Sequence, residues 1–274
     1  MAKIKEQKKT KKSSKPNTSL SAKPTIGIIG GCGVLATVDI EKEIIQAAQR
    51  LMFPIVDQDY PNMLVYQYTQ FHDRNDAICF NGRSPYKQYL KCANALVSIG
   101  VQVLLFACNT AHIHIGALKK KIKTPIIDMI QEAVKDTMTR FPGVSKIGLL
   151  STDATIKAKL YQKAFAPYKV SIITPSAFIR KQVMRAIYLI KAGITNEGYQ
   201  NGSHLKKTEK TLLINNHPHK KILLQKDIPK PCELINNAVL HLSNKGCAHI
   251  ILGCTELPLV IKNMKANNNK ITLI

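Results

Sequence analysis

Short apolar runs alternate with stretches of helical periodicity along most of this chain. The first run, TIGIIGGCG at 25–33, is typical of a strand that enters a glycine turn, and 35–52 then repeats apolar residues at helical spacing. The same reading predicts further strands at 62–68, 101–107, 124–130, 145–151, 169–176 and 249–252, and further helices at 84–100, 112–122, 156–168, 177–193 and 237–246. Strands that alternate with helices indicate an α/β architecture with parallel sheets.

The two halves of the chain resemble each other. Gly27 in IGIIGG matches Gly148 in IGLLST, and a motif around Cys108 matches one around Cys254. We therefore expect two similar domains, at 24–143 and 144–274, each with a central, mainly parallel sheet flanked by helices. The active site is expected in the interdomain cleft, because ligands of such sheets bind beyond the carboxyl ends of the strands. One arrangement that we consider has the C-terminal segment pack back on the first domain.

Two segments interrupt this pattern. Residues 1–23 carry eight lysines and one glutamate, within a chain whose net charge is +23, and they lack apolar periodicity. We predict a disordered basic tail there, and favour a solvated tail over nucleic-acid contact because no aromatic or arginine residue is interleaved with the lysines. The polar and basic stretch at about 196–230 is predicted to be an insertion in the second domain that runs over the surface.

Composition narrows the class of protein. Apolar residues make up 45% of the chain, which is enough for a hydrophobic core. No apolar run is long enough to span a membrane, and the first residues lack the apolar region of a secretory signal. Seven cysteines without a CxxC pair are typical of reduced thiols. The sequence thus predicts a cytoplasmic protein with no membrane partner.

Two cysteine motifs carry the candidate chemistry. Cys108 is followed by Asn109 and Thr110, and Cys254 by Thr255 and Glu256; each motif comes directly after an apolar, strand-like run. We expect the two thiols to face one small acid between the domains. A thiol has an ordinary pKa of about 8.5. One cysteine could therefore remove a proton from the acid as a thiolate, while the other, as a thiol, returns one to the opposite face. Amides at strand-to-helix turns would favour the thiolate and bind a carboxylate.

Neighbouring residues limit this interpretation. A carboxylate at Glu256 would raise the pKa of Cys254, so Glu256 is interpreted as an orienting residue or as the partner of a cation. The GGCG turn that contains Cys32 matches neither a dinucleotide-binding nor a phosphate-binding loop. His112 and His114 would point to different faces of a helix, so no metal site is predicted.

Five segments, in this order, carry a family resemblance: IGIIGGCGVLATVD, FHDR, ACNTAH, AIYLIKAG and ILGCTELPLV. Together they resemble the aspartate/glutamate racemase superfamily, and within it the aspartate racemase branch. The resemblance implies racemisation of an acidic amino acid with no cofactor and no metal, by two-base proton transfer between two cysteines. It also implies a homodimer.

The resemblance assigns roles by position. Cys108 and Cys254 resemble the two proton-transfer cysteines, and Arg74 of FHDR resembles an arginine that binds a substrate carboxylate. Further residues resemble contacts of the substrate or of the thiols: Asn109, Thr110, Thr255, Lys191, Ser151 or Thr152, and Cys32.

Two departures from the branch bear on the substrate. Cys32 replaces a methionine that lies near the substrate in the family, and the insertion after Gly193 could reshape access to the site. The sequence leaves open whether aspartate or glutamate is the substrate. It also leaves open which cysteine serves which enantiomer. Two other functions are also considered: a related two-cysteine isomerase of the maleate isomerase or hydantoin racemase type, and a non-catalytic binding protein whose basic tail contacts nucleic acid.

Overall fold

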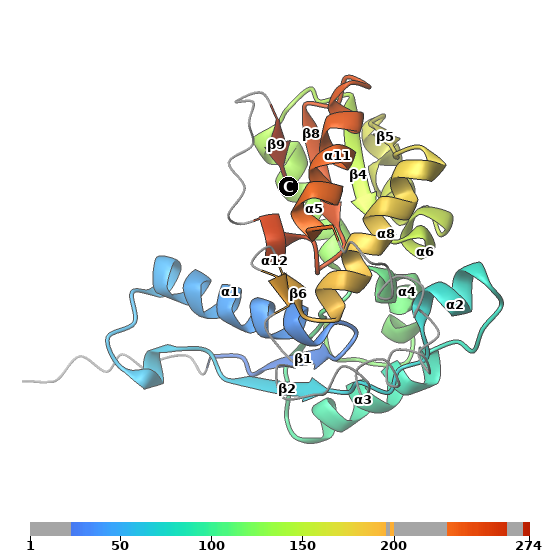
Figure 1. The fold of residues 1–274 in the computed structure, drawn as a ribbon. Helices are drawn as coiled ribbons and strands as arrows, with labels where there is room; N and C mark the ends of the chain where they lie inside the picture. Colours follow the sequence, from blue (N-terminus) through green and yellow to red (C-terminus); the bar gives the residue numbers. More distant parts are fainter. Residues whose placement is uncertain (1–22, 196–197, 200–228, 262–270) are drawn as a thin grey trace, which may run out of the picture.

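The computed structural model describes residues 23–195, 198–199, 229–261 and 271–274. The basic tail and most of the predicted insertion lie outside the described residues. Two parallel sheets, each flanked by helices, form two lobes (Figure 1). The α/β prediction is therefore confirmed.

The first sheet has the strand order β2-β1-β3 and is parallel throughout. Its strands are β1 (Ile26–Gly30), β2 (Met63–Gln67) and β3 (Val103–Phe106). The helices of this lobe are α1 (Val34–Met52), α2 (Arg74–Cys79), α3 (Tyr86–Ser98) and α4 (Ile115–Lys119). The next helix, α5 (Met129–Arg140), packs in the second lobe. Helices α1 and α3 lie on opposite sides of the sheet, while α5 leads on into the second lobe and packs against α7 there (Figure 1).

The second sheet has the strand order β5-β4-β8-β9, and all of its pairs are parallel. Its strands are β4 (Lys146–Ser151), β5 (Ser171–Ile173), β8 (His249–Gly253) and β9 (Thr272–Leu273). The helices are α6 (Asp153–Lys157), α7 (Leu160–Phe165), α8 (Ala177–Lys191), α11 (Pro231–Ser243) and α12 (Pro258–Ile261). A small antiparallel pair, β6 (Ile194–Thr195) and β7 (Gly198–Tyr199), follows α8.

Alternation along the strands divides the core of the second lobe into two layers. On β4, Leu149 packs toward α5 and α7, whereas its neighbour Leu150 packs toward α8 and α11, and both are fully buried. Ile251 and Ile250 of β8 repeat this division. A strand buried on both faces reads as a continuous apolar run, which is why KIGLLS and HIILG were recognisable in the sequence.

Three expectations need correction. The strand expected at 124–130 is reduced to one bridge, Leu104 with Ile126, because the Asp128 carboxylate accepts hydrogen bonds from the amides of Ile130 and Gln131 and starts α5. The helix expected at 156–168 is interrupted at Lys159, whose φ of 55° is left-handed. The described end of the chain joins the second sheet through β9, and so does not pack back on the first domain.

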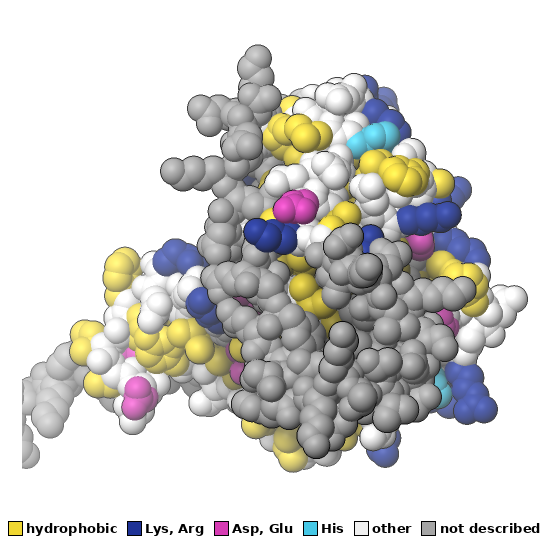
Figure 2. Space-filling view, in the orientation of Figure 1, with side chains coloured by type: hydrophobic (Ala, Val, Ile, Leu, Met, Phe, Trp, Pro, Cys, Tyr) yellow, Lys and Arg dark blue, Asp and Glu magenta, His cyan; other side chains and the backbone are white. Residues whose placement is uncertain are grey.

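Several apolar side chains of α1 and of the residue after it are exposed. Val38 and Leu51 of the helix and Phe53 directly after it are at 54%, 79% and 80% exposure. Figure 2 shows hydrophobic side chains gathered over the lobe that carries this helix. Exposed apolar patches of this kind usually mark surfaces that contact another molecule. Within the described residues, no helix combines the length and the apolar character needed to cross a membrane.

Candidate active site

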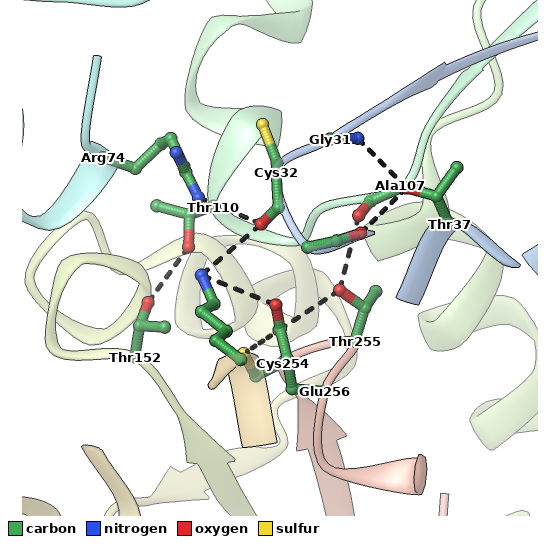
Figure 3. Close-up of polar contacts among 12 residues, drawn as sticks. Gly31, Cys32, Thr37, Arg74, Ala107, Thr110, Thr152, Cys254, Thr255 and Glu256 are labelled. Atoms are coloured by element: carbon green, nitrogen blue, oxygen red, sulfur yellow. Dashed lines mark hydrogen bonds and ion pairs between the residues drawn. The ribbon is translucent and has the colours of Figure 1, made fainter. Parts of the chain in front are cut away.

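The two cysteine motifs meet where the lobes face each other. Cys108 follows the carboxyl end of β3, and Cys254 follows that of β8 directly; both are buried, at 7% and 5% exposure. The hydroxyl of Thr255 donates a hydrogen bond of 3.4 Å to the carbonyl of Ala107, the residue before Cys108. The loops that carry the two thiols are therefore in direct contact (Figure 3).

Cys254 is held as a neutral thiol. Its Sγ donates to Oε2 of Glu256 at 2.9 Å, and Glu256 is itself buried, at 3% exposure. Burial and the neighbouring carboxylate both raise the pKa of Cys254 well above its ordinary value, and they outweigh the opposing effect of Lys191. The thiol therefore stays protonated at neutral pH, ready to give a proton away.

Cys108 has the opposite character. A hydrogen bond with the Cys32 thiol lowers its pKa most, and the charges of Arg74 and Lys191 lower it further. Burial and the carboxylate of Glu256 oppose these effects, and the resulting pKa is about 6. At neutral pH, Cys108 is therefore mainly a thiolate, the form that can accept a proton.

Two cations converge beside the thiols. Nη2 of Arg74, at the start of α2, donates to the Cys32 carbonyl at 3.0 Å, and Nζ of Lys191, at the end of α8, approaches the same oxygen at 3.5 Å (Figure 3). Lys191 also pairs with Oε1 of Glu256 at 3.5 Å. Burial lowers the pKa of Arg74, but the acidic groups of Cys32 and Cys108 outweigh it and hold that pKa above its usual range. Both side chains are therefore cations inside the site.

The glycine turn brings the first lobe against the Cys254 loop. Gly31 has a φ of +90°, and a Cβ atom built on it would lie 2.1 Å from the carbonyl oxygen of Tyr68. A Cβ atom on Gly33 would lie 2.2 Å from Oε1 of Glu256. Gly31 thus provides the left-handed backbone conformation of the turn, and Gly33 leaves room for the carboxylate of Glu256.

The remaining polar residues mostly bind each other across the lobes. The hydroxyl of Thr110 lies 3.0 Å from the hydroxyls of both Thr152 and Thr155. Tyr161 donates its hydroxyl proton to the side-chain oxygen of Asn109. Asn109, Thr110 and Thr152 are among the residues expected to contact substrate or thiols, and in the structure these hydrogen bonds join the two lobes.

Several site residues were not predicted. No local signal in the sequence marks them. Tyr89 and Tyr161 lie within the expected helices 84–100 and 156–168, and Thr155 directly precedes the second, where each is typical of an ordinary core or surface residue. The imidazole of His112 is also engaged locally: Nδ1 pairs with the Cys108 carbonyl at 2.9 Å, and Nε2 accepts from the Met129 amide at 3.1 Å. Among the described residues, no three His, Cys, Asp or Glu side chains group closely enough to hold a metal ion.

A cavity of about 610 Å³ lies between α2 of the first lobe and α6 and α8 of the second. Its walls come from α2 and the residue after it, from α6 and from α8: Asn75, Asp76, Cys79, Phe80, Asp153, Ile156, Lys157, Arg180, Met184 and Tyr188. Asn75 neighbours Arg74 in sequence, and Tyr188 lies one helical turn before Lys191. Neither the two cations nor the two thiols line this cavity.

Comparison with known proteins gives a family match and several relatives. The family model described as Asp/Glu/Hydantoin racemase matches residues 29–204. The broad specificity amino-acid racemase RacX of Bacillus subtilis is 29% identical over 140 residues, which cover 50% of this chain and 59% of that protein. A glutamate racemase of Aquifex pyrophilus is 37% identical over 75 residues, 27% of this chain and 29% of that protein. The chain thus spans at most about six tenths of these two curated relatives.

Solved structures agree on the fold. The aspartate racemase of Picrophilus torridus superposes with a TM-score of 0.64 at 24% identity, over 92% of this chain and 88% of that one. An aspartate racemase homologue from Pyrococcus horikoshii gives 0.59 at 20% identity, over 91% and 92% of the two chains. At this level of identity, the likeness establishes the two-lobed α/β fold.

Proposed function

Because this chain belongs to the Asp/Glu/hydantoin racemase family, we propose that it racemises an acidic amino acid, aspartate or glutamate, without a cofactor. The observation that carries the proposal is the pair of buried thiols, one from each lobe, on loops joined by the hydrogen bond from Thr255 to Ala107. Their surroundings support it, since they lower the pKa of Cys108 and raise that of Cys254. One group is ready to take a proton and the other to give one. A racemase of the two-base type needs this combination.

In the proposed reaction, the substrate lies between the thiols with its carboxylates near Arg74 and Lys191. The Cys108 thiolate removes the Cα proton and becomes a thiol. The Cys254 thiol delivers its proton to the opposite face of the same carbon and becomes a thiolate, so that the stereocentre inverts and no atom is gained or lost. The opposite enantiomer reacts by the reverse transfers. Neighbouring cations stabilise the negative charge that develops on the carboxylate during proton removal.

The decisive experiment supplies the protein in deuterium oxide with L-aspartate, L-glutamate, a hydantoin and maleate in separate reactions. Chiral chromatography and mass spectrometry then follow inversion and the gain of deuterium at Cα. We expect aspartate or glutamate to racemise and to gain one deuterium per inversion. Conversion of maleate or of the hydantoin alone would replace the proposal by a related isomerase.

Activity should depend on pH through the pair of thiols. As pH falls below about 6, Cys108 gains a proton and the base is lost, so kcat/KM should fall. As pH rises far above neutral, Cys254 loses its proton and the acid is lost. Both enantiomers need one proton on the pair, so we expect the same bell-shaped profile for both. Profiles of kcat/KM measured separately with the two enantiomers check this, and an acid limb near the ordinary cysteine pKa would contradict it.

Arg74 is proposed to bind a substrate carboxylate. One of its nitrogens is engaged by the Cys32 carbonyl, and the planar guanidinium can present other N–H groups to a carboxylate. We expect Arg74→Lys to raise KM by about tenfold, since an ammonium group cannot reproduce the paired geometry. Arg83→Lys, at an exposed position, is the matched control and should leave steady-state kinetics unchanged. Equal KM values for the two variants would remove Arg74 from substrate binding.

A further inference from the structure

Cys32 packs in the buried cluster of Cys108 and also contacts the two cations of the site. Its own thiol and the thiol of Cys108 each shift the pKa of the other. Its carbonyl oxygen receives both Arg74 and Lys191. In Figure 3 its sulfur points away from Cys254 and Glu256, while its carbonyl points toward them. The side chain of Cys32 therefore serves the Cys108 side of the site, and its backbone serves the cations.

A tyrosine would fix the direction of a hydrogen bond between the Cys32 and Cys108 thiols. The hydroxyl oxygen of Tyr89 lies 3.4 Å from the sulfur of Cys32, and Tyr89 is fully buried. Its ring is held between Phe71 and Phe106, with centroid distances of 4.7 and 5.4 Å. A thiol has one proton to donate, so a Cys32 that donates to Cys108 must accept from Tyr89. Tyr89, Cys32 and Cys108 can then form a chain in which each group donates to the next.

The protonation states suit this chain. Burial raises the pKa of Tyr89 well above its ordinary value, so its hydroxyl remains a donor. The neighbouring Cys108, followed by burial, raises the pKa of Cys32, so its thiol keeps its proton. Each donor can therefore strengthen the next bond by polarising it.

We propose that Cys32 is a positioning residue, whose thiol donates a hydrogen bond to the Cys108 thiolate and keeps that thiolate charged and aimed at the substrate, with Tyr89 fixing Cys32 from behind. This inference rests on the proposed function of Cys108 as a base. It gives this chain a third functional thiol, one that exchanges no proton with the substrate.

Four groups act on the charge of Cys108, and they come from different parts of the fold. Cys32 lies in the turn after β1, Arg74 at the start of α2, Lys191 at the end of α8 and Glu256 in the loop after β8. Both cations remain when Cys32 is replaced, so the pKa of Cys108 should rise without losing their contribution.

The test is a pH titration of the Cys108 thiolate without substrate. The ultraviolet absorbance of the thiolate is recorded in fully reduced protein and corrected with the same variant carrying Cys108→Ser. Against the wild type, we expect Cys32→Ala to raise the apparent pKa by about one unit or more, which is roughly tenfold less thiolate at pH values below the pKa. In Cys32→Ser the hydroxyl can still donate a hydrogen bond, so the pKa of Cys108 should stay close to the wild-type value. Cys92→Ala removes a buried thiol from the same core, and should titrate as the wild type does.

Tyr89→Phe provides an independent variant if Cys32→Ala does not fold. It removes only the hydroxyl behind Cys32, and should raise the pKa of Cys108 in the same direction by a smaller amount. The proposal is overturned if Cys108 in Cys32→Ala titrates at the wild-type pKa, or if Cys32→Ser raises the pKa of Cys108 as far as Cys32→Ala does. If Cys32→Ala does not fold, the proposal is overturned when Tyr89→Phe leaves the pKa of Cys108 unchanged. Because no substrate is present, these outcomes are separate from whether the protein is a racemase.

Discussion

Cys254→Ala is expected to lower kcat/KM for racemisation by roughly 10²- to 10⁴-fold, and Cys108→Ala by a similar factor, because each removes one of the two groups that move the proton. Both side chains are small and buried, so alanine should leave the fold in place. Chiral assays of the purified variants measure the loss, and circular dichroism checks the fold. Cys92→Ala, which removes a thiol of similar burial away from the site, should retain wild-type activity. Full activity in Cys254→Ala would end the two-thiol mechanism.

The same variants should also separate the two half-reactions. Cys254→Ala keeps the Cys108 thiolate, so it can still remove the Cα proton of the enantiomer whose C–H bond faces Cys108. In deuterium oxide, that enantiomer should gain deuterium without inverting, and its mirror image should not. The opposite preference is expected for Cys108→Ala, with slower exchange at neutral pH because Cys254 keeps its proton there. Exchange measured on each pure enantiomer would therefore assign one cysteine to each, and equal exchange of both enantiomers by one variant would contradict the geometry.

Lys191→Met is expected to destabilise the protein by about 2–4 kcal/mol, since it leaves the carboxylate of Glu256 buried without its cation. This value lies below the range for a fully buried pair because the Lys191 side chain is 27% exposed. Urea unfolding followed by circular dichroism gives the free energy of unfolding. Lys181→Met, at an exposed position of the same helix, is the matched control and should change stability by less than about 0.5 kcal/mol.

A second substitution identifies the cause of that loss. Adding Glu256→Gln to Lys191→Met removes the unpaired charge, so the double variant should recover part of the lost stability. If the two substitutions are simply additive, the destabilisation comes from lost packing of the lysine chain and not from the buried carboxylate.

Much of the fold could be predicted because burial on both faces of a sheet leaves a continuous apolar run. That signal located β1, β3, β4 and β8, and with them the positions of Cys108 and Cys254 at strand ends. Short elements escaped it. The two residues of β9 carry too few side chains to show a period.

Contacts between the lobes could not be predicted from the sequence. The hydrogen bond from Thr255 to Ala107 joins residues 148 apart, and the one from Lys191 to Cys32 joins residues 159 apart. Such pairs depend on how two separately folded sheets dock, and local periodicity carries no information on docking. The pairing of Cys32 with Cys108 belongs to the same group, which is why the sequence placed Cys32 near the substrate without indicating its partner.

In the proposed reaction, the thiols hold their protons unequally before any substrate arrives, and one turnover reverses that arrangement. After Cys108 has accepted a proton and Cys254 has given one, the negative charge lies on Cys254 beside the carboxylate of Glu256, where it is disfavoured. The enzyme released with the product is therefore not the enzyme that bound the substrate. It must either take up the opposite enantiomer or pass its proton back through solvent. Until that proton returns, a racemase that works in this way would be ready only for the enantiomer that it has just produced.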